Sequence, residues 1–173
     1  MKKLFISTFL FVIFITIIYA RSSYTGYTRK NSTVGCNCHG AANPSVMVEI
    51  TGPNQVQIGK TETFQVSISG GNGSEVCVDI AASVGSLQPY DSKLKLSNNE
   101  LITNGKKTYG TNGKYVYTFN YTAPNTVGQA TLFATGMASK NSGWNFSPDK
   151  TIQIVNSTDI SSDNIPNSFI LFQ

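Results

Sequence analysis

Short runs of alternating apolar and polar residues, separated by glycine, proline and asparagine, fill the chain from Ser45 onward. In one run Phe64, Val66 and Ile68 alternate with polar residues, and a Gly-Gly-Asn-Gly break follows. A period of two residues indicates a half-buried β-strand, and such breaks form tight turns. The alternation recurs in the runs 46–50, 76–80, 115–121, 129–138 and 150–155. We therefore predict an all-β, immunoglobulin-like antiparallel β-sandwich of about seven strands over 45–156.

The residues at the start of the chain have the composition of an export leader. Lys2 and Lys3 precede the apolar stretch 4–18, which ends at Tyr19-Ala20. This order of charged, apolar and small residues is typical of a secretory signal peptide over 1–20. A retained membrane anchor is the alternative, because the shortest spanning helices need roughly 17 apolar residues. In both cases we expect the rest of the chain to be exported.

A compact motif brings two of the three cysteines next to a histidine. Cys36, Cys38 and His39, the only histidine of the chain, lie together in Gly-Cys-Asn-Cys-His-Gly. Covalent haem attachment needs two thiols for the porphyrin vinyl groups and an adjacent imidazole for the iron, usually spaced Cys-x-x-Cys-His. The motif is one residue shorter but keeps the Cys-His adjacency. It therefore predicts haem c, attached to Cys36 and Cys38 and ligated by His39.

The third cysteine, Cys77, leaves two alternatives open. With the motif it completes a Cys3His set, which is sufficient for a tetrahedral zinc site. A disulfide from Cys77 to Cys36 or Cys38 would instead staple the N-terminal segment to the sandwich. Because Cys77 alternates with apolar residues in the run 76–80, we expect its side chain to point away from the sandwich core.

The charge balance and the spacing of possible catalytic residues argue against nucleic-acid binding and enzymatic activity. Thirteen basic and nine acidic residues give a net charge of +4, and two of the basic residues lie in the leader. The remaining charge does not predict a nucleic-acid-binding patch. The carboxylates show no local pairing, and the Cys-His pair of the motif has no third group to orient it. We therefore predict no enzymatic activity and no nucleic-acid partner.

Trp144 and Phe146 are expected in a loop that packs onto the sandwich.

Several short motifs together resemble a family of exported bacterial domains. They are Cys36-Asn37-Cys38-His39-Gly40, Thr51-Gly52-Pro53, Gly59-Lys60-Thr61, Tyr121-Thr122-Ala123-Pro124 and Gly128-Gln129-Ala130-Thr131-Leu132. The family is that of Reelin-like (Reeler-like) β-sandwiches of the choice-of-anchor type, headed by a Cys-x(1,2)-Cys-His element. The resemblance covers residues 24–156 and implies an immunoglobulin-like sandwich on a secreted or surface-anchored bacterial protein.

The same resemblance bears on the second axial ligand of a haem. Many members of the family carry a further His-Thr in the middle of the domain, whereas the corresponding stretch 100–104 here has no histidine. A six-coordinate haem would therefore take Met47, Met137, a lysine, or a group from a neighbouring subunit, and a five-coordinate haem is the alternative. We predict Met137 as the distal ligand of the iron, because Met47 is too close to His39 in the chain to fold over the opposite haem face.

The end of the chain carries a second resemblance. The stretch 165–173, Ile-Pro-Asn-Ser-Phe-Ile-Leu-Phe-Gln, follows a polar linker and resembles the opening of the C-terminal sorting domain of type IX secretion cargo in Bacteroidetes-like bacteria. It implies the outer-membrane secretion machinery as a partner. The expected organisation is a signal peptide (1–20), an N-terminal Cys-x-Cys-His segment (21–44), the sandwich (45–156), and a linker with the start of a truncated sorting tail (157–173).

Two functional hypotheses follow from the motif and the sandwich. The leading one is a secreted or cell-surface haem c protein for extracellular electron transfer, which meets a redox partner protein or assembles with neighbouring subunits. The alternative is a non-enzymatic surface adhesion or structural module whose N-terminal segment is stapled by a disulfide or by a Cys3His zinc site.

Overall fold

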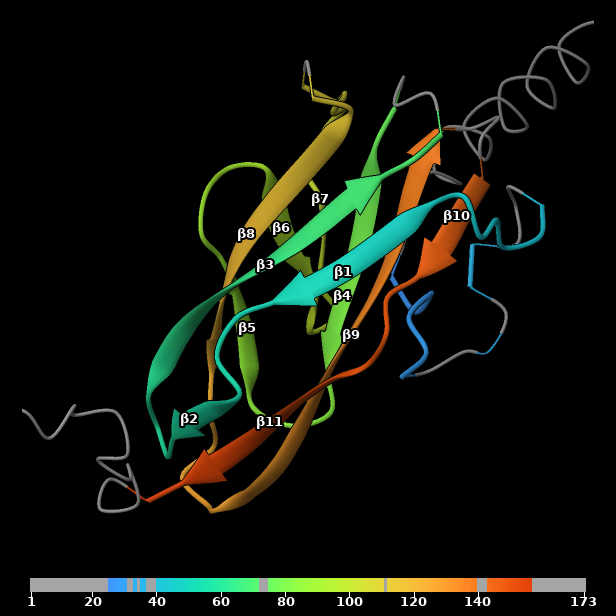
Figure 1. Cartoon of the computed structure of the whole chain (residues 1–173). Helices are drawn as coiled ribbons and strands as arrows, with labels where there is room; N and C mark the ends of the chain where they lie inside the picture. Colours follow the sequence, from blue (N-terminus) through green and yellow to red (C-terminus); the bar gives the residue numbers. More distant parts are fainter. Residues whose placement is uncertain are drawn as a thin grey trace, which may run out of the picture.

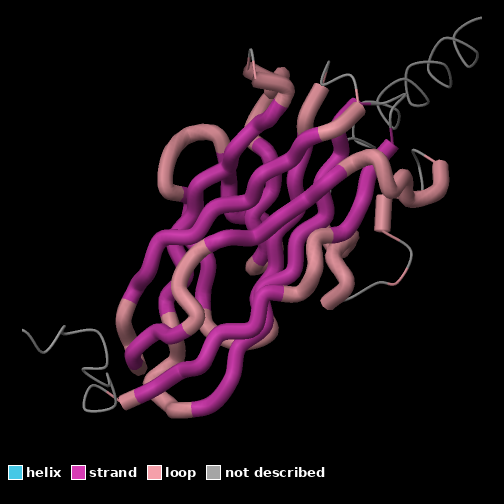
Figure 2. Tube along the Cα trace, in the orientation of Figure 1, coloured by secondary structure: helices cyan, strands magenta, loops and turns pink. Residues whose placement is uncertain are grey.

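The computed structural model describes residues 25–30, 33, 35–36, 40–71, 75–110, 112–139 and 143–156. These residues form strands and loops and no helix (Figure 2). The strands are β1 (Met47–Thr51), β2 (Gln55–Gln57), β3 (Thr61–Ser69), β4 (Cys77–Ala82), β5 (Ser86–Pro89), β6 (Leu94–Ser97), β7 (Glu100–Thr103), β8 (Lys114–Thr122), β9 (Gly128–Ser139), β10 (Gly143–Phe146) and β11 (Lys150–Val155). In this part of the chain no helix has the length and apolarity needed to span a membrane. The predicted leader and sorting tail lie outside the described residues.

The strands form two sheets that pack face to face (Figure 1). The first sheet has the order β1-β3-β8-β5, and all its pairings are antiparallel. The second sheet has the order β2-β11-β9-β4-β7-β6, with β10 paired to the other end of β9. This arrangement is the predicted all-β, immunoglobulin-like sandwich. One pairing departs from the antiparallel prediction, because β2 runs parallel to β11.

The core lies between the two sheets and consists of the apolar residues of the alternating runs. Phe64 on β3 is fully buried, and its ring stacks on Phe119 with the centroids 5.8 Å apart. The sheets approach closely at Gly136 on β9, where a Cβ atom would lie 2.8 Å from side-chain atoms of Val48 and Ile68. Alternation therefore predicts the inward face of the long strands correctly.

The structure has more strands among its described residues than the seven predicted. Three of the additional strands, β5, β6 and β7, lie in the segment 83–103, and each is four residues long. A strand of this length contains only two alternations, so its sequence pattern is too short to recognise. They form because β5 pairs with β8 and β7 pairs with β4, contacts that only the assembled sheets supply.

Candidate functional site

The outer face of the second sheet carries a second set of buried side chains. In β4, Val78 and Ile80 belong to the core, so the alternating residues Cys77 and Asp79 face outward. The prediction that Cys77 points away from the core is thus confirmed. We call the buried residues on this face the outer layer: Asp79, Ala81, Glu100, Ile102, Thr135, Met137 and Trp144.

Three residues of interest lie in one row across this face. Met137 on β9 is directly opposite Cys77 on β4 and directly opposite Trp144 on β10. Cross-strand neighbours of this kind lie about 5 Å apart. Met137, the predicted distal ligand, is therefore between the third cysteine and the tryptophan, and it is only 6% exposed. Met47, the other methionine considered, lies on edge strand β1 and is 62% exposed.

Residues 25–30, 33, 35–36 and 40–44, which we call the N-terminal arm, lie on the outer side of the second sheet beside β9 and β10 (Figure 1). The backbone N–H of Tyr27 donates to Asp79 Oδ2 at 3.0 Å, and Thr135 Oγ1 donates to the carbonyl of Tyr27 at 2.8 Å. The N–H of Gly26 donates to Glu100 Oε2. Asp79, Glu100 and Thr135 can therefore be buried on the outer face of the sheet, because the backbone of the arm supplies their hydrogen-bond partners.

The arm covers a pair of carboxyl groups that are distant in sequence. Asp79 is 4% exposed and Glu100 is 3% exposed, and the pairing of β4 with β7 brings them together. Burial, and then the charge of Glu100, raise the pKa of Asp79 to about 8. Because both carboxyl groups are closed off from solvent, we assign them to attachment of the arm. Beneath the arm, Asp79 Oδ1 and Thr28 Oγ1 are two of the three buried side-chain atoms without a hydrogen-bond partner among the described residues; the third is Tyr121 Oη in the core.

Arg29 provides a second attachment of the arm. Its guanidinium lies 3.0 Å from Asp149 and 5.2 Å from the centroid of the Phe146 ring, and it donates to the carbonyl of Ser147. The Arg29 and Asp149 side chains are 41% and 47% exposed, so the ion pair itself contributes little to stability.

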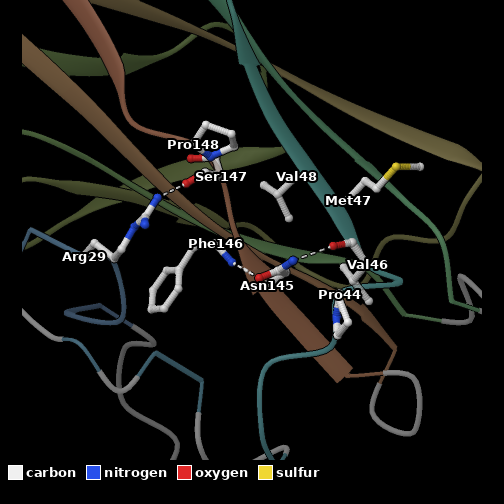
Figure 3. Close-up of a pocket in the computed structure, with 9 residues that line it drawn as sticks. All are labelled: Arg29, Pro44, Val46, Met47, Val48, Asn145, Phe146, Ser147 and Pro148. Carbon is white, nitrogen blue, oxygen red and sulfur yellow. Dashed lines mark hydrogen bonds between the residues drawn. The ribbon is translucent and has the colours of Figure 1, made fainter.

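A shallow groove of about 520 Å³ lies beside Arg29, between β1 and β10 (Figure 3). Its lining residues are Arg29, Pro44, Val46, Met47, Val48, Asn145, Phe146, Ser147 and Pro148. Arg29 and Met47 lie on opposite sides of the groove, and the Asn145 amide donates to the carbonyl of Val46 at 2.9 Å. The groove therefore borders the arm and the exposed methionine, whereas Met137 does not line it.

The motif of the arm is described at its two ends. Gly35 packs against the indole of Trp144 so closely that a Cβ atom would lie 2.2 Å from two ring carbons. At the other end, Trp144 Nε1 donates to the carbonyl of Gly40 at 2.9 Å. Cys36 is half-buried, and Cys38 and His39 lie outside the described residues. Within the described ranges no group of three His, Cys, Asp or Glu residues could bind a metal, so the haem and zinc ligand sets stay predictions.

Trp144, Asp79 and Glu100 contribute to this site, and the sequence did not assign them to it. Trp144 lies on strand β10, whereas a loop was expected, because β10 exists only through its pairing with β9. The available signal was that Trp144 is the only tryptophan of the chain. For the two carboxylates there was no signal, since an acid at an outward strand position is usually exposed.

No protein-family profile and no curated protein matches the chain. Among solved structures, it is similar to the CARDB domain of a Pyrococcus furiosus protein, solved in complex with di-metal ions. That match has 22% identity and a TM-score of 0.42 over 64% of this chain and 87% of that domain. It is also similar to the PKD domain of an M14-like peptidase from a Thermoplasmatales archaeon. That match has 14% identity and a TM-score of 0.37 over 64% of this chain and 92% of that domain. At these values neither similarity bears on function.

Proposed function

We propose that the chain is an exported, non-enzymatic β-sandwich module that carries one covalent haem on its N-terminal arm and passes electrons. The observation that carries this proposal is the contact of Gly35 and Gly40, which flank the motif, with Trp144, on a sheet face that also contains Met137. A cysteine pair, an imidazole and a thioether are the donor set of a c-type haem, and the Cys-x-Cys-His motif together with Met137 supplies these residue types.

In this proposal the residues of the chain have separate tasks. Cys36 and Cys38 would hold the haem through thioether bonds, and His39 and Met137 would donate to its iron. The bound haem would supply reversible one-electron transfer. The outer layer, which includes Trp144, keeps water from the sheet face beneath the arm, because its residues are almost fully buried. The partners are a redox protein or a neighbouring subunit, and the route to the cell surface is type IX secretion.

The first prediction tests attachment directly. Protein produced with a haem-attachment system should be red, should give a haem c spectrum in alkaline pyridine, and should keep its pigment through denaturing electrophoresis, because thioether bonds survive unfolding. The double variant Cys36→Ser/Cys38→Ser should lose all covalent pigment. The matched control Cys77→Ser should keep it. A colourless protein with the mass of the bare polypeptide contradicts the proposal.

One observation supports the second candidate, a surface adhesion or structural module with a stapled arm. Cys77 faces the same side of the second sheet as the arm and lies in the row with Met137 and Trp144. A Cys3His zinc site or a disulfide would then link the arm to β4. A zinc protein loses its folded signal on chelation, since structural zinc contributes directly to folding. In this case Cys77→Ser should destabilise the colourless protein.

A further inference from the structure

Both ends of the cysteine motif rest on a single side chain. The six-residue segment 35–40 begins at Gly35, which lies against the six-membered ring of Trp144, and ends at Gly40, whose carbonyl accepts the indole N–H. The backbone N–H of Asn43 donates to the carbonyl of Trp144 at 2.8 Å, which extends the attachment beyond the motif. One indole therefore contacts both described ends of the segment.

Trp144 is itself held rigidly, as a positioning residue must be. It is 3% exposed and lies opposite Met137 in the pairing of β10 with β9. Its ring meets the ring of Phe146 edge to face, with the centroids 5.1 Å apart. Phe146 in turn lies under the guanidinium of Arg29, so the aromatic pair is packed on several sides. Such packing leaves the indole little freedom to change rotamer.

The two glycines are suited to this close contact. Gly35 has a φ of +56° and Gly40 a φ of +86°, in the left-handed region that glycine adopts without a steric penalty. At Gly35 the restriction is also spatial, because any side chain would overlap the indole. At Gly40 a Cβ atom would meet nothing within 4 Å, so only the backbone matters there.

We propose that Trp144 is the positioning residue of the two described ends of the cysteine motif: its six-membered ring lies against Gly35 and its indole N–H donates to the Gly40 carbonyl, which together set the placement of Cys36. This role does not depend on whether the cysteines carry haem, zinc or a disulfide. It makes the only tryptophan of the chain a built-in spectroscopic reporter of the motif.

The test is NMR spectroscopy of ¹⁵N-labelled protein, in which the single indole N–H gives one assignable signal. The amide of Ala41 shares its peptide group with the Gly40 carbonyl, so its chemical shift reports the hydrogen bond from Trp144. In Gly35→Ala the added methyl group must displace the ring. We expect the indole N–H to exchange with solvent about tenfold faster, as for the loss of one hydrogen bond. The Ala41 amide signal should shift as well.

Gly113→Ala is the matched control. Gly113 has a φ of +66°, close to that of Gly35, but a Cβ atom there would meet nothing within 4 Å. This variant therefore carries the same backbone penalty without the steric overlap, and both reporter signals should stay in place. If Gly113→Ala changes the indole signal as much as Gly35→Ala does, the effect is one of general stability and the proposal is wrong.

Replacing Trp144 by β-(3-benzothienyl)alanine, in which sulfur stands in place of the indole N–H, separates the two contacts and decides the question even if Gly35→Ala does not fold. This residue keeps the fused six-membered ring for Gly35 but has no N–H for Gly40. We expect the Ala41 amide to shift while the amides of Gly35 and Cys36 stay near their original positions. An Ala41 amide that does not move overturns the proposal. The measurement needs no haem, so a failed haem assignment and a failed positioning role give different results.

Discussion

Asp79→Asn should remove most of the loss of stability that the protein shows as the pH rises from acid to alkaline. Asp79 is buried beneath the arm, and its pKa is raised to about 8, first by burial and then by the charge of Glu100. The N–H groups of Tyr27 and Gly26 lower this pKa without offsetting the rise. Asparagine keeps an oxygen that can accept the N–H of Tyr27 and removes the charge.

The sign follows from the proton balance. In the unfolded chain an aspartate titrates near 3.9, whereas folded Asp79 titrates near 8, so between these values the folded state binds more protons. The stabilisation is complete below the unfolded pKa and is lost as the pH rises through the folded pKa. The loss is at most about 1.4 kcal/mol per pH unit in this window.

Urea unfolding at about pH 5, 7 and 9 checks this result. The free energy of unfolding of the parent protein should fall across the series, and that of Asp79→Asn should fall much less. Asp91→Asn is the matched control, because Asp91 is partly exposed and pairs with Lys93 at the surface. Parallel pH profiles for the parent protein and Asp79→Asn would show that the buried carboxyl does not titrate in the folded state near pH 8.

Phe64→Ala should lower the free energy of unfolding by about 3–5 kcal/mol. Phe64 is fully buried between the sheets, where its ring stacks on Phe119 and meets Tyr121 edge to face with the centroids 6.1 Å apart. Removing the ring leaves a cavity that the neighbouring rings cannot fill, because each is fixed in its own strand. Denaturant unfolding measures the loss.

Gln65→Ala is the control for this variant, since Gln65 is the next residue of β3 and is exposed. Its effect should stay within about 0.5 kcal/mol. Equal effects at the two positions would mean that the core does not lie on the predicted side of β3.

The long strands could be predicted from the sequence because their pattern is repeated many times. In β3 and β8 each apolar residue confirms the phase set by the one before it, and the structure buries Phe64, Val66, Tyr117 and Phe119 accordingly. The short strands β5, β6 and β7 could not be predicted in this way. Their residues become strands because neighbouring strands supply hydrogen-bond partners, and a short sequence window does not contain those partners.

For the candidate site, the sequence by itself determined the motif, the outward direction of Cys77 and the export leader as a hypothesis. These depend on residue type and spacing along one strand or one segment. The sequence alone could not determine which outward residues are buried, because burial of an outer face depends on a distant segment of the chain.

Only the tertiary structure decided which residues on the outward face of the second sheet are buried and what they contact. Tyr27 meets Asp79 across 52 residues of sequence, and Gly40 meets Trp144 across 104. When the arm folds over this face, an outward aspartate becomes a buried acid with a raised pKa, and an outward tryptophan contacts Gly35 and Gly40 on either side of the cysteine motif. The physical reason is that alternation specifies only to which side of a strand a residue points, whereas desolvation depends on what the folded chain places on that side.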